Sequence, residues 1–106
     1  MSDPDSDDAL LRAKLNGETS RMPWHELQRF FAGGSMIVVD DTLDLVEVAL
    51  RIARDDKAAV AAWLEQGKIA RASDEHARGW TEADASLWAV VVKPWVLVQR
   101  EKRHAA

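Results

Sequence analysis

Three aspartates lie close together in the segment Asp40-Asp41-Thr42-Leu43-Asp44, which has the form Asp-Asp-x-x-Asp. In some isoprenoid enzymes such a motif holds Mg²⁺ on a diphosphate, because hard carboxylate oxygens suit this cation. Those enzymes are larger and all-helical, and they place the motif inside a helix. Here the aspartates follow an apolar run and precede a helical pattern. We therefore predict that Asp41 or Thr42 caps the helix and that Asp44 favours its dipole.

The three histidines are scattered along the chain. His25 falls on the polar side of a predicted amphipathic helix, so its side chain is expected to point to solvent. His76 lies in the first turn of another predicted helix, and His104 is close to the end of the sequence. A general base needs an orienting group and a nucleophile nearby, and the sequence places neither beside His25. We expect no catalytic residue, no metal site and no cofactor.

Charge and composition narrow the class of protein. The chain has 106 residues, 47% of them hydrophobic and 30% charged, as in an ordinary single globular domain. The net charge of −4 comes mainly from the acidic residues 1–8, and residues 100–106 are mostly basic. Nucleic-acid binding usually needs a basic face, which is missing here. There is no cysteine, so disulfides and thiol catalysis are excluded.

Periodicity and capping signals predict the order of the elements. We expect helices over about 8–16, 24–32, 43–54, 57–66 and 73–84, a turn at 20–23, a strand at 36–39, a short extended link at 69–72, and a long apolar run at 87–99. The acidic N-terminus has no apolar segment of the secretory type. No run reaches the roughly 18 residues of a membrane span. We therefore expect a cytoplasmic protein that contacts neither membrane nor nucleic acid.

The run from Leu87 to Gln99 is interrupted by a single Lys93-Pro94 step. As one straight strand it would reach roughly 40 Å at about 3.3 Å per residue, too long for a domain of this size. We predict a bent or bulged strand at Lys93-Pro94, with two separate strands as the alternative. A tight hairpin there is disfavoured, because proline at the third turn position calls for a cis peptide bond.

These elements predict an α+β domain. The expected sheet is small and antiparallel, with two or three strands from about 36–39 and 87–99, broken near Pro94 and packed with four or five short helices. Both strand regions are continuously apolar, so both faces of the sheet should be covered. Residues 1–8 are expected to form a disordered acidic tail, residues 9–99 the single globular domain, and residues 100–106 a charged tail.

All five tryptophans fall on predicted apolar faces or in the apolar run. We interpret them as a tryptophan-rich core, with an aromatic groove for a peptide or small ligand as the alternative. If the strands are not fully covered by this chain, part of the run could form an interface. The possible interface residues are Trp88, Trp95, Val96 and Val98.

Several segments carry a resemblance to a known family. They include Gly17-Glu18-Thr19, Leu43-Asp44-Leu45-Val46-Glu47-Val48-Ala49, Leu87-Trp88-Ala89-Val90-Val91-Val92 and Pro94-Trp95-Val96-Leu97-Val98-Gln99. In these segments the chain resembles a small bacterial family of unknown function, DUF2288, over about residues 13–99. The resemblance implies a bacterial cytoplasmic protein without an assigned activity, cofactor or catalytic residue.

Two functions follow as hypotheses. The first is a non-enzymatic interaction module that binds a protein partner or a second copy of itself. Its motivation is that the continuous apolar strands exceed what a small domain can cover, and that catalytic constellations are missing. The alternative is a small-molecule-binding protein or minor enzyme with an acidic site at the end of the first strand, using Asp40, Asp41, Asp44 and His25. The acidic segment 1–8 is a possible docking tail for a larger partner.

Overall fold

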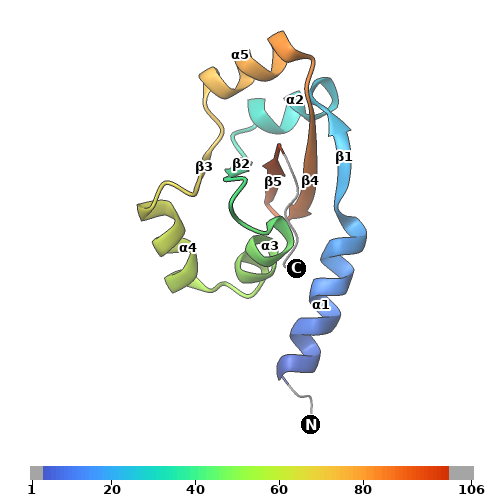
Figure 1. Cartoon of the computed structure of the whole chain (residues 1–106), viewed down its shortest axis with the longest axis vertical. Helices are drawn as coiled ribbons and strands as arrows, with labels where there is room; N and C mark the ends of the chain where they lie inside the picture. Colours follow the sequence, from blue (N-terminus) through green and yellow to red (C-terminus); the bar gives the residue numbers. More distant parts are fainter. Residues whose placement is uncertain (1–3, 101–106) are drawn as a thin grey trace.

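The structure is a computed structural model that describes residues 4–100. Its helices are α1 (Pro4–Glu18), α2 (Trp24–Ala32), α3 (Leu45–Ala53), α4 (Lys57–Glu65) and α5 (Asp74–Ala83). Its strands are β1 (Ser20–Pro23), β2 (Met36–Val39), β3 (Ile69–Arg71), β4 (Ser86–Val92) and β5 (Trp95–Gln99). The predicted α+β class is confirmed, and the helices α2 to α5 lie close to their expected ranges (Figure 1).

The sheet is larger than expected. Within the described residues it has five strands in the order β1-β4-β5-β2-β3. It is mixed, because β2 pairs with β5 in parallel, with Ile37 opposite Leu97, while the other pairs are antiparallel. The prediction of a two- or three-stranded antiparallel sheet is therefore wrong. The two extra strands are the short edges β1, predicted as a turn, and β3, predicted as an extended link.

The chain reverses at Lys93-Pro94. The predicted bent strand is wrong there, and the alternative of two strands holds: β4 and β5 pair antiparallel, with Val92 opposite Trp95. The Lys93-Pro94 peptide bond is cis, which is the geometry that allows proline at the third position of a tight turn. The reversal pairs the two apolar strands with each other in the middle of the sheet.

Both faces of the sheet are covered by this chain itself. Alternate strand residues such as Ile37, Val90 and Leu97 pack with α1, α3 and α4. The intervening residues, such as Met36 and Val96, pack with α2 and α5. In Figure 1, α2 and α5 lie together at one end of the molecule, and α1, α3 and α4 lie toward the other. The chain itself thus covers most of both faces, and Val91 of β4 is 52% exposed.

Helix α1 extends away from the rest of the molecule (Figure 1). The whole molecule, including α1, measures 50 × 28 × 28 Å along its principal axes. The C-terminal part of α1 is anchored by the buried Leu15 and by an ion pair of 2.8 Å between Arg12 and Glu47. The helix begins at Pro4, so residues 4–8 are helical where an acidic tail was predicted. Residues 1–3 and 101–106 of the two predicted tails lie outside the described residues.

Candidate functional site

The acidic candidates form a turn and a helix cap. The Asp44 carboxylate accepts hydrogen bonds from the backbone N–H groups of Val46 and Glu47 at 3.0 and 3.4 Å, which makes it the N-cap of α3. The cap is thus Asp44, and not Asp41 or Thr42 as predicted. Asp40 accepts a hydrogen bond of 3.0 Å from the Thr42 hydroxyl. This bond holds the pKa of Asp40 below its usual range.

We find no support for a metal in this turn. Among the described residues, no three histidine, aspartate or glutamate side chains are arranged to hold a metal ion. The side chains of Asp40 and Asp44 accept hydrogen bonds from neighbours two or three residues away in the chain, as expected for local capping. The Asp-Asp-x-x-Asp spacing is therefore explained by the entry of the chain into α3.

Replacing Asp44 with alanine tests the capping role. The substitution leaves two backbone N–H groups of α3 without their side-chain acceptor, so the free energy of unfolding should fall by about 1 kcal/mol. Urea denaturation followed by circular dichroism measures the change. Asp41→Ala is the matched control, with an expected change within about 0.5 kcal/mol. An equal loss in both variants would contradict the assignment of Asp44 as the cap.

The histidines are not brought to the aspartates. His25 is exposed on α2, which covers the opposite face of the sheet from α3. His76 forms a capping box with Ser73 at the start of α5, with 2.9 Å between the Ser73 hydroxyl and Nδ1. The His76 ring also stacks on Trp80 at 5.5 Å. These contacts give His76 a structural role. His25 and the aspartates lie on helices or turns of opposite faces of the sheet, so they do not form one site.

The possible interface residues separate into two pairs. Val96 and Val98 are 3% and 0% exposed in the core beneath α2 and α5, so they offer no surface to a partner. Trp88 and Trp95 are half-buried against the other core cluster. The alternation along β4 and β5 explains which cluster each residue joins, because neighbouring residues of a strand point to opposite faces of the sheet.

A broad groove lies beside α5. It has a volume of about 1150 Å³, and its lining includes Trp80, Trp88 and side chains of both charge signs, Arg21, Glu75, Asp84 and Arg100. The Trp80 ring is itself buried beneath His76. The lining carries charges of both signs, so charge does not favour a single class of ligand.

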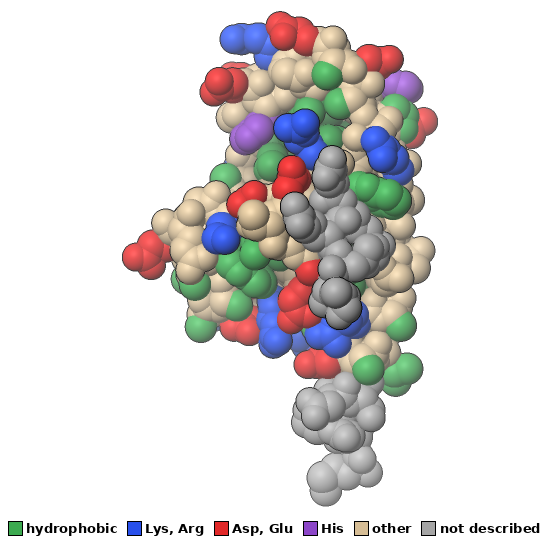
Figure 2. Space-filling view, in the orientation of Figure 1, with side chains coloured by type: hydrophobic (Ala, Val, Ile, Leu, Met, Phe, Trp, Pro, Cys, Tyr) green, Lys and Arg blue, Asp and Glu red, His purple; other side chains and the backbone are tan. Residues whose placement is uncertain are grey.

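A second cavity, which we call the α4 pocket, lies between α4 and the sheet. Its volume is about 490 Å³, and its apolar lining includes Ile37, Ile52, Val60, Leu64, Ile69 and Trp95. Helix α4 has no fully buried residue and carries four alanines, Ala58, Ala59, Ala61 and Ala62. Of these alanines, Ala61 lines the pocket, beside Val60 and Leu64 of the same helix. Figure 2 shows apolar side chains at the surface where α4 lies.

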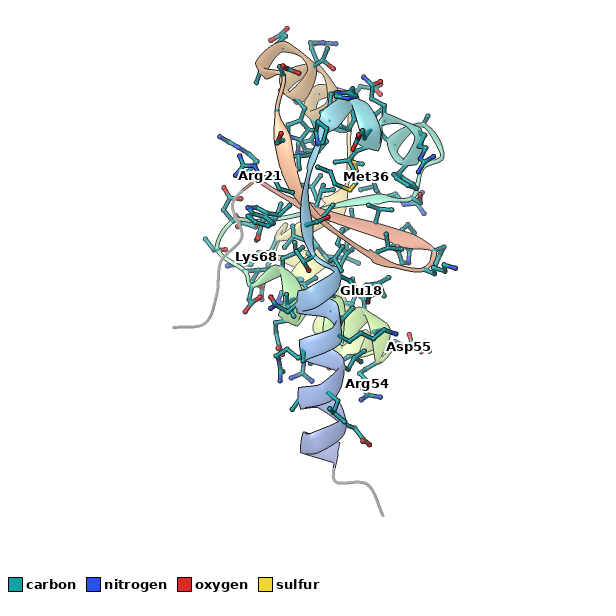
Figure 3. All side chains as sticks on the ribbon, turned by 90° about the vertical axis from the view of Figure 1, so that its right-hand side faces the viewer. Glu18, Arg21, Met36, Arg54, Asp55 and Lys68 are labelled. Atoms are coloured by element: carbon teal, nitrogen blue, oxygen red, sulfur yellow. The ribbon has the colours of Figure 1, made fainter. Side chains whose placement is uncertain are left out.

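Charged side chains surround the mouth of the α4 pocket. Asp55, Asp56 and Lys57 come from the junction of α3 and α4, and Arg71 and Lys93 come from β3 and the β4–β5 turn. The Arg71 guanidinium lies over the Trp95 ring at 5.2 Å. In Figure 3, Asp55 lies at the outer edge of the α3–α4 junction. An apolar cavity with a few charged groups at its mouth has the general form of a small-molecule site.

The chain is similar in sequence to a described protein family and in sequence and structure to a solved protein. Residues 10–100 match the family model described as "Protein of unknown function (DUF2288)". The NMR solution structure of PA1075 from Pseudomonas aeruginosa is 45% identical, with a TM-score of 0.78, over 100% of this chain and 98% of that one. No curated protein matches the chain. Within the described residues, no helix has the length and apolar character needed to cross a membrane.

Proposed function

The chain belongs to the DUF2288 family of unknown function, and from that starting point we propose that it is a binding protein for a small, largely apolar molecule held in the α4 pocket. The observation that carries this proposal is the pocket itself, with a volume of about 490 Å³ and a mainly aliphatic and aromatic lining. Ligand cavities of small molecules fall in the range of about 300–1,000 Å³. The setting that we propose is the bacterial cytoplasm, as the sequence predicts.

Binding is favoured over catalysis by the state of the carboxylates at the pocket. Asp56 caps α4 through the Ala59 N–H at 3.1 Å and lies 3.6 Å from Arg51. Asp55 lies 4.0 Å from Lys57. Both carboxylates therefore have cationic or capping partners, and the described lining of the pocket contains no serine, threonine or histidine. These features support a site that holds its ligand without transforming it.

Self-association has less support from the geometry than the sequence suggested. Most of the apolar strand residues that motivated it are covered by the helices of the same chain. The edge strands β1 and β3 are only four and three residues long, and Pro23 and Arg71 lie in them, features that discourage pairing with another sheet. The features that favour it are two exposed apolar side chains, Leu10 on α1 at 72% and Val91 on β4 at 52%. The molar mass from light scattering measures it directly.

Titration with 1-octanol tests the proposed function. In ¹H–¹⁵N spectra, we expect shifts at the Trp95 indole N–H and at the amides of Ile37 and Ile69, because these residues line the pocket. Ala61→Phe places a large ring in the pocket and should abolish the shifts. Ala62→Phe is the matched control, since Ala62 is exposed on the same helix and does not line the pocket. Shifts that are absent, or unchanged by Ala61→Phe, would overturn the proposal.

A further inference from the structure

The charges at the mouth of the α4 pocket are not evenly balanced. The carboxylates of Asp55 and Asp56 lie near Lys57 and Arg51, respectively. Arg71 and Lys93 also line the pocket, and neither forms an ion pair with a carboxylate in the described part of the chain. Two cations are therefore left to face the ligand on the side of the pocket formed by Trp95.

The position of Arg71 suits it to bind an anion. Its backbone is held in β3 opposite Ile37, and its guanidinium lies over the Trp95 ring at 5.2 Å. Stacking on an aromatic face orients the guanidinium and leaves the N–H groups around its edge able to donate. A carboxylate can accept two of these N–H groups in parallel. The ring of Trp95 would then contact the apolar part of the same ligand.

Lys93 adds a second positive charge to the lining of the pocket. It lies in the β4–β5 turn, two residues before Trp95 in the chain, and it lines the pocket. The turn joins two paired strands, so the backbone that carries Lys93 is fixed relative to the Trp95 ring. A lysine ammonium acts on an anion as a compact charge without a strict geometry, so it complements the directional donors of Arg71.

We propose that the ligand of the α4 pocket is an amphipathic monoanion, whose apolar body lies against Trp95 and the aliphatic lining and whose carboxylate is bound by Arg71 and Lys93. This inference rests on the proposed function, because it specifies the class of molecule that the same pocket takes. It also explains the composition of the mouth. The carboxylates there lie near other cations, and two cations remain, of which Arg71 lies over the Trp95 ring.

Three probes of equal chain length test the charge preference. Octanoate, 1-octanol and octylammonium have the same apolar body and carry a negative, a neutral and a positive head group. We expect octanoate to bind about tenfold more tightly than octanol, the effect of one charge-assisted hydrogen bond at a partly exposed site. Octylammonium should bind more weakly than octanol. The ¹H–¹⁵N shifts of the lining residues give each dissociation constant, and the octanoate affinity should fall as salt is added.

Single substitutions locate the preference. Arg71→Gln and Lys93→Gln should each weaken octanoate binding several-fold and leave octanol binding unchanged. Lys57→Gln is the matched control, because Lys57 lines the same mouth beside Asp55, and it should leave octanoate binding unchanged. Equal affinity for octanoate and octanol, or equal effects of Arg71→Gln and Lys57→Gln, would overturn the inference and leave the proposed function standing. Absence of binding by all three probes would overturn both.

Discussion

Gln99→Glu is expected to lower the free energy of unfolding by about 3–5 kcal/mol at neutral pH, the cost of a buried charge without a partner. Gln99 is 1% exposed, and its Nε2 donates to the backbone carbonyls of Asp40 and Leu43 at 2.8 and 2.7 Å. An ionised carboxylate has no hydrogen to donate, so it would face two carbonyl oxygens at close range. The Oε1 atom of Gln99 has no hydrogen-bond partner among the described residues, so no nearby donor would compensate the new charge.

The cost of Gln99→Glu should depend on pH. Burial and the two carbonyl oxygens raise the folded-state pKa of the introduced carboxyl above the value of about 4.3 in the unfolded chain. As pH falls below about 4 both states hold the proton, so the charge adds no cost and only the loss of one donor remains. The additional cost grows as pH rises from the unfolded pKa to the folded pKa. Urea denaturation of both proteins at about pH 4 and pH 7 measures the difference.

Gln99→Met is the control for the pH dependence. Methionine removes both N–H donors and adds no titratable group, so its cost of about 1–3 kcal/mol for each unsatisfied carbonyl should be the same at both pH values. A pH-independent loss in Gln99→Glu would contradict the burial of this side chain. The same pair of variants tests the link between β5 and the turn after β2, since Gln99 joins Asp40 and Leu43 across more than 50 residues of sequence.

The helices were predictable because their signals are local. In α3, the apolar residues Leu45, Val46 and Ala49 follow helical spacing and are buried as expected. The breaks at Gly33 and Gly34 and at Asp55 and Asp56 also mark the helix ends correctly. Such patterns are contained in a dozen neighbouring residues, so the sequence alone is sufficient to recognise them.

The arrangement of the strands was not predictable, because it depends on contacts between distant segments. β1 contains Ser20, Arg21 and Pro23 and has no apolar alternation, and it becomes a strand only by pairing with β4. The parallel pairing of β2 with β5 joins segments about sixty residues apart. At Lys93-Pro94 the preference against a tight turn was outweighed by pairing of the two apolar strands that flank it.

In the candidate site, too, the local features were predictable from the sequence and the features that depend on long-range contacts were not. The aspartates at 40, 41 and 44 formed a visible motif, and the structure gives Asp40 and Asp44 local turn and capping bonds. The α4 pocket could not be predicted, because its lining comes from α3, α4, β2, β3, β5 and the β4–β5 turn. The available signals were the alanine-rich segment 57–65 and the sequence Lys93-Pro94-Trp95. Neither signal alone predicts a pocket, because the two segments line it only after the fold brings them together.

Trp24→Ala is expected to lower the free energy of unfolding by about 3–5 kcal/mol, the range for removing a buried tryptophan. Trp24 is 4% exposed at the start of α2. Its ring lies 5.0 Å from Trp80 and 5.8 Å from Phe31, and its Nε1 donates to the Thr81 hydroxyl at 2.8 Å. The side chain thus joins α2 to α5, and alanine would leave a cavity between the two helices.

The contribution of the ring can be separated from that of its hydrogen bond. Thr81→Val removes the acceptor and keeps the ring, so it should cost only about 1 kcal/mol, and an equal loss in Trp24→Ala and Thr81→Val would contradict the cavity argument. Trp24 packs on the face of the sheet opposite the α4 pocket. The folded Trp24→Ala protein should therefore bind octanol as the wild type does. A loss of that affinity would show that the two faces are coupled, and that the pocket depends on more of the core than its own lining.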